Sequence, residues 1–154
     1  MSGSVTADRL RSHWADVRSK LMETIEKFGD TDLEFEAFAG AYSVRQLMLH
    51  IAHEELGEVQ HGITYALTAW PDDFAVDKHL TVAAIKRKLD EVHSQTLAFL
   101  RSLDDGSLAE TVETPWGSSG TREELLGHVL EHEIHHRGEL SLILGMLGRG
   151  GIDV

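Results

Sequence analysis

Two histidines near the C-terminal end of the chain, His132 and His136, lie four residues apart in a segment with helical periodicity. Each residue advances a helix by about 100°, so residues i and i+4 differ by about 40° and their side chains lie side by side. Two adjacent imidazoles can therefore bind one cation, as they do in helical zinc-binding motifs. The pair predicts part of a divalent-metal site.

Both histidines interrupt the apolar stripe of their predicted helix. The stripe contains Leu125, Val129, His132, His136, Leu140, Ile143 and Leu147. Neighbouring carboxylates could satisfy the two rings in a core, but burying two polar rings is costly unless something binds their lone pairs. We therefore favour the metal site. Glu139, three residues after His136, could accept a ring N–H and fix its tautomer, or it could be solvated.

A catalytic centre of this kind commonly has three protein ligands and open positions for other molecules. The third ligand must then come from another helix, and the second predicted helix offers His50, His53 and Glu54. Spacing alone does not choose among these three. The remaining two would stay near the metal as groups that transfer protons.

Two further histidines flank the pair on the last helix. His128 lies one turn before His132, and His135 lies about 100° around the helix from His136. His128 could complete a ladder of three histidines on this helix. We expect instead that both lie at the rim of the site, so that His53, Glu54, His128 and His135 are the candidate catalytic groups.

Four segments with helical periodicity must position these side chains. They run from about Ala7 to Phe28, from Ser43 to about Trp70, from Thr81 to Leu103, and from Thr121 to Leu147. Ser43 and Thr121 each precede a Gln or Glu by three residues, as in capping boxes. We find no strand-like alternation, and the sequence predicts an all-α four-helix bundle in a single domain over residues 1–154. The loops 70–78 and 104–120 could cover a site, with Trp70 and Trp116 at its mouth.

Composition limits the classes of function. The net charge of −12 leaves no basic face for nucleic acid and would be repelled by anionic membranes. The chain has no cysteine, which excludes disulfides, Cys-ligated zinc and a cysteine nucleophile, so any thiol must come from a substrate. No leader-like or transmembrane run is present, and we expect a cytoplasmic protein.

The pattern S-V-R-Q-L-x-x-H-I-A around His50, together with H-V-L-E-H-E-I-H-H-R-G-E-L from His128 to Leu140, resembles the DinB/YfiT-like superfamily. The resemblance covers essentially the whole chain. It implies that His50, His132 and His136 hold one divalent metal, and that the bundle has a long crossover and forms a homodimer. The family's usual Gln after Arg-Gly is replaced here by Glu139.

The resemblance also implies chemistry with a low-molecular-weight thiol, such as bacillithiol or mycothiol, that is transferred to an electrophile or used in isomerisation. A cation held by neutral imidazoles could activate such a thiol, or a water molecule. We expect a metal-dependent thiol transferase acting on a small thiol and an electrophile. The alternatives are a hydrolase with Glu54 or Glu139 as base, and a noncatalytic metal-binding stress-response protein. Relative affinities favour Zn or Ni over Fe or Mn.

Overall fold

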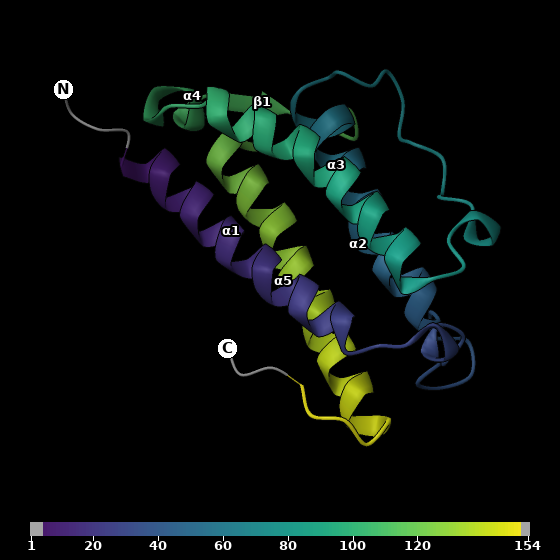
Figure 1. Ribbon diagram of the computed structural model, residues 1–154. Coiled ribbons are helices and arrows are strands. Elements are labelled where there is room, and N and C mark those ends of the chain that lie inside the picture. Colours follow the sequence, from purple (N-terminus) through teal and green to yellow (C-terminus); the bar gives the residue numbers. More distant parts are fainter. Residues whose placement is uncertain (1–4, 152–154) are drawn as a thin grey trace.

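The computed structural model describes residues 5–151, which form four long helices joined by shorter elements (Figure 1). In chain order the elements are α1 (Val5–Glu26), η1 (Asp30–Asp32), α2 (Val44–Leu56), η2 (Gly57–Ile63), η3 (Val76–Lys78), α3 (Val82–Ser102), α4 (Asp105–Ala109), β1 (Thr111–Glu113), β2 (Ser119–Thr121) and α5 (Arg122–Met146). The predicted four-helix bundle is confirmed. None of the helices in this part of the chain is long and apolar enough to span a membrane.

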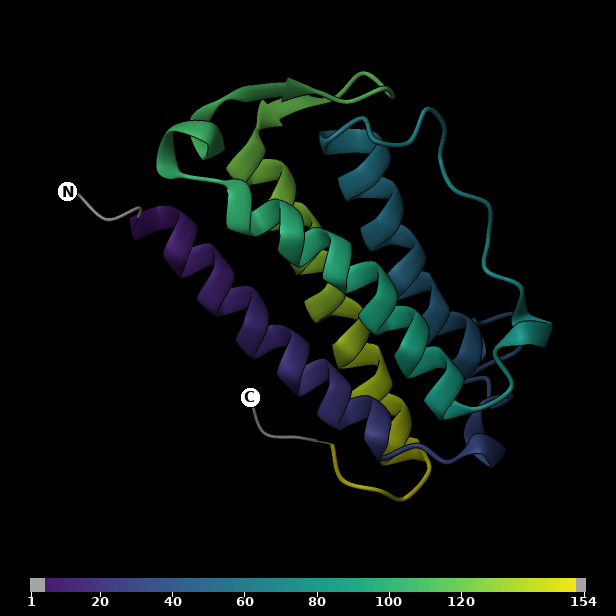
Figure 2. The ribbon, with the colours of Figure 1, turned by 45° about the horizontal axis from the view of Figure 1, so that its top comes forward.

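Each long helix packs against two others, in the ring order α1, α3, α2, α5. Helices α2 and α3 run in the same direction, and the segment 64–81 between them returns along the outside of the bundle (Figure 2). This segment is the long crossover that the resemblance implied. Helices α2 and α5 run in opposite directions and lie side by side, so groups on both can meet between them.

Apolar burial and end caps explain why these segments are helical. In α1, Trp14, Leu21 and Ile25 are fully buried at helical spacing. The predicted capping boxes are present, because the side chains of Ser43 and Thr121 accept hydrogen bonds from the N–H groups three residues later. A cap of this kind contributes about 1 kcal/mol, so the starts of α2 and α5 are set locally.

The second helix ends earlier than predicted. The α-helix stops at Leu56 and continues to Ile63 as the π-helical segment η2, in which the N–H of Thr64 donates to the carbonyl of Val59. Tyr65 then adopts a φ of 56°, which a right-handed helix cannot accommodate. Trp70 therefore belongs to the crossover and not to the helix.

The predicted loop 104–120 is also more regular than expected. It contains the short helix α4 and an antiparallel pair of strands in which Val112 lies opposite Gly120. This short hairpin was not visible in the sequence, where we found no strand-like alternation. Each strand has only three residues, too few for an alternating pattern to be visible in the sequence.

The buried face of α5 differs from the predicted stripe. Its buried residues are Leu126, Val129, Leu130, Glu133, Leu140, Ile143 and Leu144. Leu125 and Leu147 are only partly buried, whereas Val129, Leu140 and Ile143 are buried as predicted. His132 and His136 consequently lie at the edge of the buried face, half-buried, and Glu133 occupies the core.

Two glycines at the end of the second helix make room for indole rings. A Cβ placed on Gly57 would lie 2.5 Å from Cζ2 of Trp70, and one on Gly62 would lie 2.4 Å from Cη2 of Trp116. The two indoles also pack against each other, with ring centroids 5.6 Å apart. This contact holds the crossover and the hairpin against the bundle.

We predict that Gly57→Ala lowers the free energy of unfolding by about 1–3 kcal/mol, because the added methyl group forces the Trp70 ring away. Urea unfolding would measure the change. Gly127→Ala is the matched control, because its Cβ meets no atom within 4 Å and it lies inside α5. The free energy of unfolding of Gly127→Ala should rise by about 0.5–1 kcal/mol. Equal changes in the two variants would contradict the prediction.

Candidate metal centre

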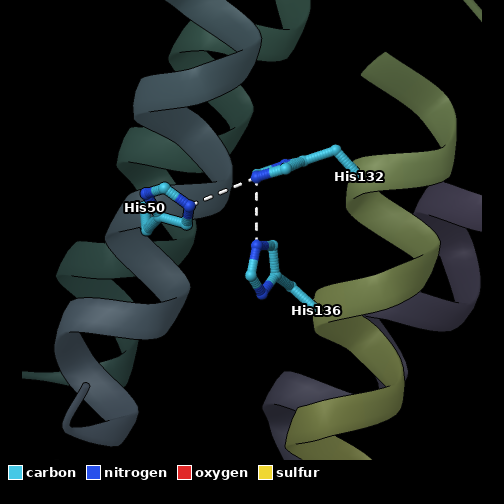
Figure 3. A group of neighbouring side chains, drawn as sticks. All are labelled: His50, His132 and His136. Carbon is cyan, nitrogen blue, oxygen red and sulfur yellow. Dashed lines mark hydrogen bonds between the residues drawn. The ribbon is translucent and has the colours of Figure 1, made fainter. Parts of the chain in front are cut away.

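Three histidine rings from two helices converge between α2 and α5 (Figure 3). His50 comes from α2, and His132 and His136 come from successive turns of α5. The Nε2 atom of His132 lies 3.2 Å from Nε2 of His50 and 3.0 Å from Nε2 of His136. One nitrogen from each ring lies within 4.8 Å of the other two. Helical spacing did not choose among His50, His53 and Glu54 as the third ligand. In the structure, His50 is the residue of α2 that faces His132 and His136.

The donor set fits a divalent transition-metal ion. Ions such as zinc hold imidazole nitrogens at about 2.0–2.1 Å, which places two nitrogens of a tetrahedral site about 3.3 Å apart. Nδ1 of His136 lies 2.5 Å from Oε2 of Glu139 and donates its proton to that carboxylate. The lone pair of His136 is therefore on Nε2, the nitrogen that faces His132. Glu139 therefore lies where it can fix the tautomer of His136, which was one of the two roles considered for it from the sequence.

The surroundings keep these rings neutral, as a metal ligand must be. Burial, followed by the nearby rings of His136 and His50, lowers the pKa of His132 to about 3. Burial also lowers the pKa of His50, with a further contribution from His136. At neutral pH both rings therefore keep a nitrogen lone pair for a cation.

His53 and Glu54 lie directly beside the three histidines. Oε1 of Glu54 is 3.8 Å from Nδ1 of His50 and 3.7 Å from Nδ1 of His53. Nε2 of His53 lies 2.8 Å from the carbonyl oxygen of Pro71 and donates to it, so Nδ1 is the ring nitrogen that faces Glu54. Burial raises the pKa of Glu54, against an opposing effect of His53. The carboxyl group is therefore poised to take up a proton next to the centre.

The structure places the two rim histidines differently. His128 lines a small cavity of about 30 Å³ together with Glu54, Glu58, Val129 and His132. The side chain of His135 is 67 % exposed, and its Nε2 lies 3.5 Å from Oε1 of Glu139. His128 therefore shares a cavity with a candidate ligand, whereas His135 points mainly to solvent.

A larger cavity of about 140 Å³ opens beside His50. It is lined by Tyr42, Gln46, Leu49, His50, His53, Asp73, Phe74 and Val76. Its aromatic walls are Tyr42 and Phe74, not the Trp70 and Trp116 expected from the sequence. Sequence reasoning missed both, because Tyr42 precedes the second helix and Phe74 lies in the crossover, where no periodicity identifies a facing residue.

We predict that the metal-free protein loses stability as the pH falls from about 6.5 toward 3. The unfolded chain takes up a proton at His132 near the ordinary pKa of 6.5, but the folded chain does so only near 3. In this window the unfolded state binds more protons, so acid favours unfolding. Urea midpoints measured between pH 7.5 and 4.5 should fall less steeply for His132→Gln, and identical slopes for the two proteins would contradict the assignment.

Fold and site together define a helical bundle with a cluster of histidines that could bind a metal between two of its helices. The model of the DinB family matches residues 1–153, and the chain belongs to this family. The uncharacterized protein YizA of Bacillus subtilis is 33% identical over 75 residues, which are 46% of this chain and 47% of YizA. The match thus spans about half the length of that relative.

Solved structures share the fold at low sequence identity. YfiT from Bacillus subtilis, a probable metal-dependent hydrolase with an unusual four-helix bundle topology, has a TM-score of 0.67 at 21% identity, covering 94% of this chain and 89% of YfiT. The mycothiol-dependent maleylpyruvate isomerase has a TM-score of 0.55 at 14% identity, covering 88% of this chain and 62% of the isomerase. At these identities the likeness concerns the fold.

Proposed function

We propose that this protein is a metal-dependent enzyme that transfers a low-molecular-weight thiol to an electrophile, with His50, His132 and His136 as the ligands of one divalent ion. The observation that carries the proposal is the convergence of three Nε2 atoms, with separations of 3.2 and 3.0 Å along the chain of rings. A divalent ion held by neutral imidazoles would lower the pKa of a thiol that reaches its open positions. Zinc and nickel suit this donor set best.

The residues around the centre have separate roles in this proposal. Glu54, whose pKa burial raises, accepts the thiol proton and passes it to His53 or to water. His128 reaches the small cavity on the side of His132 and can move a proton there. The larger cavity beside His50 offers Leu49, Phe74 and Val76 for the apolar part of the electrophile.

One feature favours a thiol cosubstrate. The absence of cysteine from the chain is compatible with a thiol that arrives as a cosubstrate. A structural neighbour, the isomerase, depends on mycothiol. The runner-up is a hydrolase in which Glu54 activates water, favoured by the likeness to YfiT. The homodimer implied by the resemblance stays a prediction.

We expect zinc-loaded protein, purified without a nickel column, to accelerate conjugation of cysteine, bacillithiol or mycothiol with monochlorobimane. A sulfur–carbon bond forms, the carbon–chlorine bond breaks, chloride leaves, and the thiol proton passes to Glu54. The product's fluorescence measures the rate. Because proton transfer typically contributes 10²–10⁴-fold, Glu54→Gln should lose about a hundredfold in rate.

The controls separate the alternatives. His132→Ala should reduce conjugation to the rate without protein, whereas His13→Ala, which changes an exposed histidine on α1, should not. Zinc-dependent cleavage of nitrophenyl esters or anilides without conjugation would favour the hydrolase. Bound zinc with neither activity would contradict both enzymatic proposals and favour a metal-binding role.

A further inference from the structure

One buried polar side chain from each long helix meets at the centre of the bundle. Arg18 of α1, Glu55 of α2, His93 of α3 and Glu133 of α5 each expose 8 % or less of the side chain. Nη2 of Arg18 lies 2.5 Å from Oε2 of Glu55 and 2.8 Å from Oε2 of Glu133. Nδ1 of His93 lies 2.7 Å from Oε1 of Glu55, and Trp14 donates to Glu133 over 3.1 Å. We call these four residues the ion cluster.

The ion cluster is a poor source of stability. Removing charges from water costs several kcal/mol per ion, and apolar residues of similar volume are often as good or better in a core. Within the described part of the chain, Nε and Nη1 of Arg18 and Oε1 of Glu133 also have no hydrogen-bond partner. Such a cluster can supply specificity instead, because all four polar side chains meet at only one relative rotation of the four helices.

The ion cluster is connected through the backbone to the histidines of the proposed centre. Glu133 directly follows His132 on α5, and Glu55 lies five residues after His50 on α2. Because successive helical residues are about 100° apart, anchoring Glu133 inside the bundle fixes the direction in which His132 leaves the helix. In the same way, anchoring Glu55 inside the bundle fixes the direction in which His50 leaves α2, about one and a half helical turns earlier.

Small rotations matter at such a site. A side-chain nitrogen about 6 Å from the helix axis moves by about 2 Å when the helix turns by 20°. Metal–ligand distances tolerate only about 0.2 Å. Apolar packing between α2 and α5 adapts to such rotations at little cost, whereas the charge pairs do not.

We infer that Arg18, Glu55, His93 and Glu133 are positioning residues, which set the rotation of α2 and α5 at which His50, His132 and His136 converge on a metal ion. The inference rests on the proposed metal centre and assigns these residues no contact with metal or substrate. If the inference is right, replacing the ion cluster lowers the affinity for the metal even where it leaves the stability of the fold unchanged.

The test replaces the whole ion cluster by apolar residues of similar volume, through Arg18→Met, Glu55→Leu, His93→Phe and Glu133→Leu combined. Zinc affinity is measured by competition with a chromophoric chelator, and the ligand geometry by the visible absorption of the cobalt-saturated protein. We expect the thermal midpoint to stay within a few degrees of the parent. Zinc affinity should fall about ten- to a hundredfold, the range found when groups that orient metal ligands are removed, and the cobalt bands should shift.

Two single variants complete the test. Glu133→Gln keeps the shape and the acceptor for Trp14 but removes the charge, and should weaken zinc binding and shift the cobalt bands. If the combined variant does not fold, the zinc affinity of Glu133→Gln tests the inference on its own. Ile25→Val, a fully buried apolar change in the same helix as Arg18, lowers stability without altering any charge pair, so its zinc affinity should match the parent.

Parental zinc affinity and cobalt bands in folded Glu133→Gln or in the folded combined variant would overturn the inference. An affinity loss as large in Ile25→Val would also overturn it, because general stability would then explain the effect. If the parent protein bound no zinc, the proposed metal centre would be wrong as well. The failure of the inference alone is thus distinguishable from the failure of the proposed function.

Discussion

His132→Ala is expected to abolish the metal binding that we propose. His132 is the middle ring of the three, because its Nε2 atom contacts both His50 and His136. Without it, only His50 and His136 remain, and we expect the affinity to fall by at least the roughly hundredfold effect known for groups that only orient a ligand. Elemental analysis of protein purified without a nickel column should find about one equivalent of metal in the parent and a small fraction of that in the variant.

The informative comparison is His135→Ala on the same helix. His135, His136 and Glu139 form a second group with donor atoms close enough to hold a metal, but His135 is mostly exposed. We expect His135→Ala to keep its metal. The opposite pattern, with metal lost from His135→Ala and kept by His132→Ala, would move the site to the outer group and contradict our assignment.

Zinc is expected to raise the thermal midpoint of the metal-free protein by roughly 8–16 °C. Free zinc at a thousandfold excess over its dissociation constant adds about 4 kcal/mol to the folded state. Each kcal/mol corresponds to about 2–4 °C in a domain of this size. Calorimetry before and after treatment with a chelator measures the shift.

Two controls accompany the calorimetry. Magnesium at the same concentration should leave the midpoint unchanged, because it prefers oxygen ligands. His132→Ala should show almost no response to zinc. A shift of similar size in this variant would mean that zinc stabilises the protein at some other place, and the three-histidine centre would be wrong.

The sequence was sufficient for the parts of the fold and site that depend on local spacing. Helix periodicity and capping residues predicted all four long helices, and the four-residue separation of His132 and His136 predicted that they lie together. The approach of His50 depends on how α2 packs against α5, which spacing could not show. The family pattern alone pointed to His50 as the third ligand, since His53 and Glu54 fit the same helix equally well, and this role stays a prediction.

Other features depend on tertiary packing and were not visible beforehand. Glu133 lies in the core only because Arg18 and Trp14 meet it there, and a glutamate beside a histidine is ordinarily expected at the surface. The helical backbone that begins with α2 ends after Ile63, just before Tyr65 adopts a positive φ, and tyrosine is a residue type that carries no turn signal. The stripe of α5 was predicted only in part, because the two histidines were counted as core positions.

The proposed metal ligands and one wall of the neighbouring cavity come from two different kinds of structure, the helices of the bundle and the crossover of segment 64–81. The three histidines stand on helices inside the packed bundle, but one wall of the cavity beside His50, formed by Asp73, Phe74 and Val76, belongs to this outer connection. Surface connections accept substitutions and changes of length more readily than helices do. In the proposed enzyme, substitutions in this connection would therefore change the preference for the electrophile without changing the three histidines.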